Sequence, residues 1–111
     1  MNRDEAVYLQ HILDAIAKAE SYLEGMDESA FNRSSLIQDC VIRQIEIIGE
    51  ATKRLSPELR AKNAHIPWSD IAGMRDKFIH GYFGVEVGNV WLTAVEDLRA
   101  CETTLRRFWQ N

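Results

Sequence analysis

The sequence predicts an all-α fold, an up-and-down bundle of helices in one domain spanning residues 1–111. Apolar residues recur at steps of three and four along most of the chain, which is the period of a helix with one buried face. Two helix starts are marked by proline, at Pro57 and Pro67, and no segment shows the alternation expected of a strand. At 111 residues the chain is long enough to bury one hydrophobic core.

Two long helices follow from the spacing in the first half of the chain. The first is predicted over residues 3–24, with Gly25 as its C-terminal stop, and the second over residues 34–55 after an irregular stretch at 27–34. The second helix carries apolar residues on more than one stripe. That pattern is typical of a central helix or of one shared with a partner chain, so we expect a homodimer.

Three helices are predicted in the second half. A short one follows the Ser-Pro-Glu start at residues 56–58 and ends near 63, and another runs from Pro67 to about Gly81. The last is the most regular, with an apolar seam that suits packing in a bundle. This seam consists of Val87, Trp91, Ala94, Leu98, Cys101, Leu105 and Phe108.

Composition excludes several classes of protein. No apolar run approaches the roughly 18 residues that a membrane span needs, and the polar N-terminus resembles no secretory signal, so we expect a cytoplasmic protein. The net charge of −4 argues against a general nucleic-acid coat. Cys40 and Cys101 are predicted to be core residues rather than metal ligands, and the glycines of "GYFGVEVG" do not match a dinucleotide-binding loop. No metal or cofactor is expected.

The stretch "MRDKFIHGYF", residues 74–83, places charged groups among apolar ones. An arginine on an apolar stripe is costly unless it is paired or lines a cleft, which makes Arg75 a candidate site residue. Asp76 and His80 are four apart, and a carboxylate beside an imidazole favours protonation near neutral pH, as an acid/base catalyst requires. The alternative is a salt bridge and, separately, a helix-capping role for His80, with Tyr82 as an interface aromatic.

Three segments carry a family resemblance: "VIRQIEIIGEATKRL" at 41–55, "IPWSDIAGMRDKFIHGYF" at 66–83, and "VW" at 90–91. Together they resemble the HepT-like proteins of the HEPN superfamily. The hallmark of that group is an arginine, a polar residue, and a histidine after four to six positions, with a tyrosine two residues further on. Here these residues are Arg75, Asp76, His80 and Tyr82.

The resemblance implies a homodimer in which two motif helices meet in a cleft that cuts RNA without a metal. In this scheme His80 is the acid/base, Arg75 holds the scissile phosphate, and Asp76 orients one of them. It further implies a toxin paired with a nucleotidyltransferase antitoxin, which transfers AMP to Tyr82 and silences the nuclease. The two proteins would form a hetero-oligomer.

Basic residues elsewhere are candidates for RNA contact, with a solvated charged face as the alternative reading. They are Arg43, Lys53, Arg54 and Lys77. A rival interpretation of the whole chain is a non-catalytic HEPN module that partners a nucleotidyltransferase. The acidic net charge favours this rival, whereas the intact motif favours the nuclease.

Overall fold

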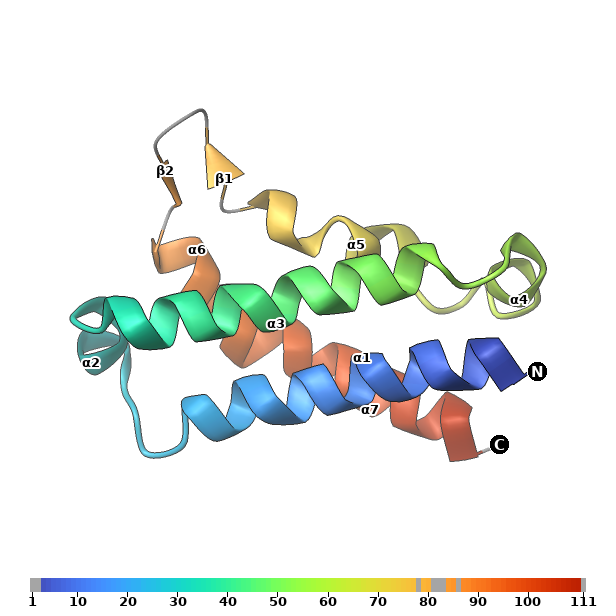
Figure 1. The fold of residues 1–111 in the computed structure, drawn as a ribbon, viewed down its shortest axis with the longest axis horizontal. Helices are drawn as coiled ribbons and strands as arrows, with labels where there is room; N and C mark the ends of the chain where they lie inside the picture. The colour runs from blue at the N-terminus through green and yellow to red at the C-terminus, as the bar shows by residue number, and fades with distance from the viewer. Residues whose placement is uncertain (1–2, 78, 81–83, 86, 111) are drawn as a thin grey trace.

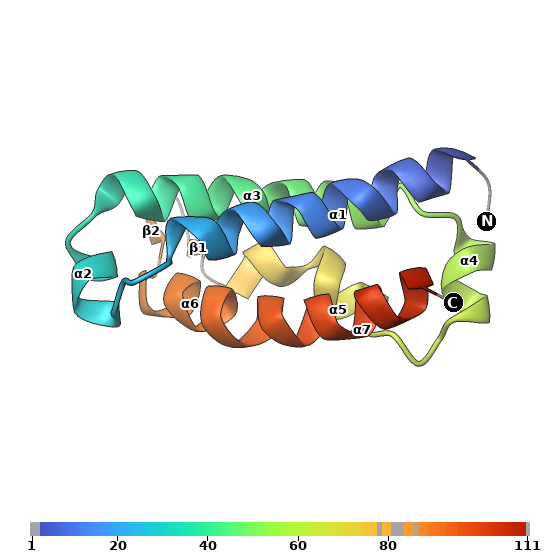
Figure 2. The same ribbon diagram turned by 90° about the horizontal axis from the view of Figure 1, so that it is seen from below.

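Two long helices form one layer of the molecule, and shorter segments form a second layer beneath them. The computed structural model describes residues 3–77, 79–80, 84–85 and 87–110, and at 77, 79, 80, 84, 85, 109 and 110 it describes the backbone alone. Helices α1 (Arg3–Tyr22) and α3 (Ser35–Lys53) lie side by side and antiparallel (Figure 1). Beneath them lie α5 (Trp68–Ala72), α6 (Val87–Leu92) and α7 (Leu98–Gln110) (Figure 2). The predicted all-α, up-and-down bundle is confirmed.

Side-chain caps explain where several helices begin. The Ser34 hydroxyl accepts a hydrogen bond from the Ile37 amide at the start of α3, and Ser56 accepts one from Leu59 at the start of α4 (Pro57–Lys62). Part of the stretch predicted to be irregular forms a further short helix, α2 (Glu28–Asn32), because Asp27 caps it through the Ala30 amide at 2.8 Å. Prediction of the long helices was correct to within two residues.

The core lies between the two layers. Its largest fully buried side chains come from α1, α2, α3 and α7 and from the connections before α4 and α5: Leu9, Ile12, Ile16, Phe31, Val41, Ile45, Ile48, Leu55, Ile66, Leu98 and Leu105. Four residues of the predicted C-terminal seam are buried, and Cys101 is among them. Burial raises the pKa of the Cys101 thiol to about 12, so it stays protonated at neutral pH. No helix in the described segments is long and apolar enough to cross a membrane.

The last predicted helix contains a wider turn. Residues Thr93–Asp97 between α6 and α7 adopt a π-helical turn, in which the Leu98 amide bonds to the Thr93 carbonyl. Thr93 and Ala94 are buried at this point. A π turn inserts one residue without ending the helix, so the apolar seam continues through it.

The helix predicted from Pro67 to Gly81 is wrong in its second half. Helix α5 ends at Ala72, a 3₁₀ turn follows at Met74–Lys77, and β1 (Ile79–His80) pairs antiparallel with β2 (Gly84–Val85). Gly73 is a poor helix residue and caps α5, and the sequence beyond it is rich in glycine, aromatic and β-branched residues that favour strands and turns. The described residues of the motif, Arg75, Asp76 and His80, therefore lie on a turn and a hairpin strand rather than on one helix.

A pair of carboxyl groups joins α1 to α7. On α7, Glu102 Oε1 accepts a hydrogen bond from Arg106 at 3.1 Å, while its buried Oε2 has no hydrogen-bond donor among the described residues. Glu20 of α1 shares a side-chain hydrogen bond with Glu102. The hydrogen bond to Glu102, with burial and the charge of Glu102, raises the pKa of Glu20 to about 7, while the same bond lowers the pKa of Glu102 despite its burial. The positive charges of Arg99 and Arg106 lower the pKa of both Glu20 and Glu102.

This pair predicts a pH dependence of stability. Because the folded chain keeps a proton on Glu20 that the unfolded chain loses near pH 4.5, the free energy of unfolding should fall as pH rises from about 4.5 to about 7. In Glu20→Gln the amide donates without titrating, so that slope should flatten and stability above pH 7 should rise. Urea unfolding at several pH values measures it. Glu24→Gln, at an exposed position, is the control. Equal slopes in wild type and Glu20→Gln would contradict the assignment of the pH dependence to Glu20.

Candidate functional site

The segment that carries the motif is anchored by three apolar side chains. Trp68, Ile71 and Met74 are buried at intervals of three residues, on one face of α5 and the turn Met74–Lys77. The Trp68 indole donates to the Asn63 carbonyl at 3.1 Å, and its ring packs edge-on against Phe108 of α7. Because Met74, not Arg75, continues the buried face, the two residues after it point outward and are exposed.

A close backbone contact fixes this segment against α3. A Cβ atom built on Gly49 would lie 2.9 Å from the Ala72 carbonyl oxygen, which is closer than side chains normally approach. Only glycine leaves room for α5 at this distance. Gly49 belongs to the "IGEA" stretch that carried the family resemblance, and its structural role is to seat the end of α5 on the helix that also carries Glu46.

Arg75 lies between two carboxylates from different elements. Its Nη1 is 3.8 Å from Glu46 Oε2 on α3, and its Nε is 3.6 Å from Asp76 Oδ1 on the same turn. The side chains of Arg75 and Glu46 are 45% and 37% exposed, and that of Asp76 is 77% exposed. The guanidinium is thus held at the surface by ion pairs that leave it open to an approaching anion.

Of the remaining motif residues, the structure places only His80, on the hairpin. His80 is in β1, opposite Gly84, and the structure describes its backbone but not its side chain. Tyr82 falls outside the described residues, and for Lys77 only the backbone is described. The single helix predicted to carry Asp76 and His80 is wrong, because Asp76 lies in the turn Met74–Lys77 and His80 in β1, and Asp76 forms an ion pair with Arg75.

The other basic residues lie along α3. Arg43 is exposed one turn before Glu46, so it faces the same side of the helix as the partner of Arg75. Lys53 is also exposed and lies about 10 Å along the axis from Glu46, at 1.5 Å per residue. Arg54 caps the end of α3. Arg43 therefore lies one turn from the partner of Arg75, whereas Lys53 and Arg54 lie at the C-terminal end of α3.

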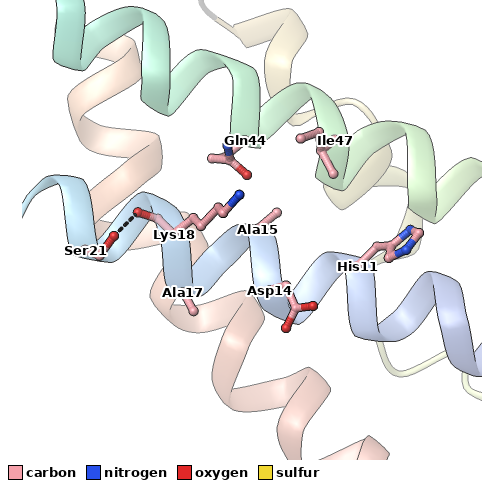
Figure 3. Close-up of a pocket in the computed structure, with 8 residues that line it drawn as sticks. All are labelled: His11, Asp14, Ala15, Ala17, Lys18, Ser21, Gln44 and Ile47. Carbon is pink, nitrogen blue, oxygen red and sulfur yellow. Dashed lines mark hydrogen bonds between the residues drawn. The ribbon is translucent and has the colours of Figure 1, made fainter.

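A separate hollow opens between α1 and α3 (Figure 3). Its volume is about 660 Å³, and its polar lining comes from His11, Asp14, Lys18, Ser21 and Gln44. Asp14 accepts a hydrogen bond from Gln10, and the Ser21 hydroxyl donates to the Lys18 carbonyl. The lining mixes charges of both signs and includes none of the motif residues, so it is distinct from the site at Arg75. No motif in the sequence marked these residues.

Sequence comparison places the motif in a known family. The family model described as Ribonuclease HepT-like matches residues 12–108, nearly the whole bundle. The chain belongs to the HepT-like ribonuclease family. The match covers α3, the Arg75 turn and the hairpin, so these elements are parts of a HepT-like domain of the HEPN type.

Named relatives share this HepT-like domain. A "gamma-glutamylcyclotransferase and putative RNase" of Methanocaldococcus jannaschii is 47% identical over 88% of this chain, which spans only 44% of that longer protein. A "putative RNase" of Caldanaerobacter subterraneus subsp. tengcongensis is 37% identical over 94% of the chain and 93% of its own length. A "probable ribonuclease HepT" of Thermococcus cleftensis is 40% identical over 88% of the chain and 89% of its own. No solved structure matches the chain.

Proposed function

We propose that this HepT-like chain is a metal-independent endoribonuclease with Arg75 and His80 as its catalytic residues and Asp76 in support. The observation that carries the proposal is the half-exposed guanidinium of Arg75, held on a turn that is anchored to the core and lies just before the strand that contains His80. The RNase names of the relatives support RNA as the substrate class.

The proposed reaction is attack by an RNA 2′-hydroxyl on the adjacent phosphorus. One histidine takes the hydroxyl proton, the bond to the 5′-oxygen of the next nucleotide breaks, and a second acid protonates that oxygen. The products are a 2′,3′-cyclic phosphate and a 5′-hydroxyl. Arg75 binds the non-bridging oxygens, whose negative charge grows in the transition state, because a guanidinium pairs with two phosphate oxygens at once.

A homodimer supplies the second acid in this scheme. Each copy contributes one His80, so the base and the acid come from two chains. Apolar side chains of α3 outside the buried stripe support such an assembly: Leu36 is 71% exposed, and Ile37, Ile42 and Ile47 are half-buried. Light scattering of the purified protein should give twice the chain mass, and a monomer would leave the acid unassigned.

We also propose that a nucleotidyltransferase partner silences this nuclease, as the antitoxin to a cytoplasmic toxin. The phenol oxygen of Tyr82 attacks the α-phosphorus of ATP, pyrophosphate leaves, and the phenol proton is released. The new phosphate places negative charge close to Arg75 in sequence, where it opposes RNA binding. Mass spectrometry after co-expression with the nucleotidyltransferase should find an AMP-sized increment on Tyr82. The same silencing without this increment would show that the partner acts by masking.

The nuclease proposal is tested by incubating wild type and His80→Ala with mixed tRNA and mRNA in EDTA. General acid–base catalysis contributes about 10²- to 10⁴-fold, so the variant should lose nearly all cleavage. An intact mass measured on the same sample excludes prior modification of Tyr82. Unmodified wild type that cleaves no RNA, or cleaves only after Mg²⁺ is added, would contradict the proposal.

The acidic net charge of −4 supports a second candidate, a non-catalytic module that binds a nucleotidyltransferase. Under this alternative the Arg75 turn is a contact surface for the partner. Expression without the partner distinguishes the two functions, because a nuclease arrests growth and a binding module does not.

A further inference from the structure

Glu46 on α3 is a side chain that the structure brings to Arg75 from a distant part of the sequence. It lies 29 positions before Arg75 and is not part of the Arg–His motif. Its Oε2 is 3.8 Å from Arg75 Nη1, and both side chains are half-exposed. The position of Glu46 beside Arg75 affects which anions the guanidinium can bind.

Close packing of the two segments that carry Glu46 and Arg75 keeps these residues together. Gly49 is one turn from Glu46 on α3 and touches the Ala72 carbonyl, three residues before Arg75. Met74, adjacent to Arg75, is buried in the core. The Cα atoms of Glu46 and Arg75 are therefore carried by two segments packed directly on each other.

The arrangement of the guanidinium nitrogens makes Glu46 a competitor of phosphate. An arginine binds an oxyanion with two nitrogens, through either its side edge, which uses Nε, or its end edge, which uses Nη1. Here Asp76 occupies the Nε side at 3.6 Å and Glu46 occupies Nη1 at 3.8 Å. A phosphate that binds through two nitrogens must therefore displace one carboxylate.

Glu46 is the carboxylate that gives way. Asp76 is the next residue in the chain and cannot leave the neighbourhood of Arg75, whereas Glu46 makes the longer ion pair from another helix. Together the two carboxylates give the Arg75 cluster a net charge of −1 at neutral pH. An RNA phosphate is attracted to this cluster only when one carboxylate moves aside.

We propose that Glu46 sets the RNA affinity of the Arg75 site by occupying the guanidinium until a substrate phosphate replaces it. The inference rests on the proposed ribonuclease function and deepens it. Since Glu46 is displaced before the chemical step, its removal should change binding and leave the catalytic rate constant unaltered. Exposed ion pairs of this kind change an equilibrium constant by up to about fivefold.

The test compares Glu46→Gln with Glu50→Gln, which removes the same charge one turn further along α3 from an exposed position. Affinity is measured by fluorescence anisotropy with a labelled 2′-O-methyl RNA oligonucleotide, which lacks the attacking hydroxyl. Glu46→Gln should lower Kd and KM by about two- to fivefold with kcat unchanged, beyond any effect of Glu50→Gln. Glu46→Asp keeps the charge and should stay near wild type. In an Arg75→Ala background the two glutamine variants should become equivalent.

Other outcomes separate this inference from the function on which it rests. Equal Kd values for Glu46→Gln and Glu50→Gln, or weaker binding by Glu46→Gln, would overturn the role of Glu46 even if the wild type cleaves RNA. A fall in kcat with unchanged Kd would overturn it too. Tighter probe binding specific to Glu46→Gln, without cleavage of any RNA by the wild type, would retain the anion site and reject the nuclease. Absence of probe binding by every variant would reject the inference.

Discussion

Replacing Arg75 by alanine should reduce kcat/KM for RNA cleavage by about 10²- to 10³-fold, the usual cost of removing one group that stabilises transition-state charge. The guanidinium is the only described cationic group of the motif that the structure places at the surface beside carboxylates from two elements. Lysine at this position keeps the charge but cannot pair with two phosphate oxygens. Arg75→Lys should therefore give an intermediate rate.

The measurement is the initial rate of cleavage of a labelled RNA in EDTA, with thermal unfolding run on each variant. Arg107→Ala is the matched control, because it removes the same charge from an exposed position in the last turns of α7. It should cleave RNA like the wild type. Wild-type activity in Arg75→Ala would show that the guanidinium does not take part in the reaction.

Gly49→Ala should destabilise the fold more than any surface substitution. The added methyl group would meet the Ala72 carbonyl oxygen at 2.9 Å, and a backbone atom cannot rotate away as a side chain does. Overpacking of this kind costs about 1–3 kcal/mol, and the better helix propensity of alanine offsets at most about 1 kcal/mol. In a chain of this size 1 kcal/mol corresponds to about 4–8 °C in Tm, so a fall of several degrees is expected.

The same substitution at Gly88 in α6 provides the control. A Cβ atom there meets nothing within 4 Å, so Gly88→Ala should be neutral or stabilise by up to about 1 kcal/mol. Gly49→Ala should also impair RNA cleavage, because α5 and the Arg75 turn must shift away from α3. If both variants unfold at the wild-type temperature, the contact of Gly49 with Ala72 does not hold the segment.

Most of the bundle was predictable because its signals are local. The caps at Ser34 and Ser56 and the apolar steps of α1 and α7 each depend on residues within a few positions of one another. Asp27, which begins α2, is the same kind of signal, but the irregular composition around it obscured the cap. Helix lengths set by such signals came out within two residues.

The conformation of the motif was not predictable from spacing. The helical pattern of Ile71 and Arg75 suggested one face, but Gly73 ends α5, and the next segment pairs as a hairpin. The π turn before α7 was likewise not predictable. The residue that it inserts leaves the average spacing of apolar residues in the seam between three and four. The first case has a local cause, because Gly73 and the aromatic and β-branched residues after it disfavour a helix, but the apolar spacing does not reveal it.

The contact of Glu46 with Arg75 was not predictable from the spacing of residues either. The sequence indicated that Arg75 needs a partner or a cleft but paired Asp76 with His80, whereas the structure places Asp76 and, from α3, Glu46 29 residues away beside Arg75. The stretch "IGEA" close to Glu46 marked α3 as part of the family resemblance without indicating a contact. That contact depends on the close approach of Gly49 to Ala72.

The chemistry of the RNA ends tests the central claim most directly. Purified protein with an unmodified Tyr82, confirmed by intact mass, is incubated in EDTA with two labelled oligonucleotides, one all-RNA and one with a 2′-deoxy residue at the mapped cleavage position. We predict cleavage of the all-RNA strand alone, leaving a 2′,3′-cyclic phosphate and a 5′-hydroxyl. Cleavage of the 2′-deoxy strand at that position, or fragments ending in a 3′-hydroxyl, would contradict attack by the 2′-hydroxyl and the roles given to His80 and Arg75.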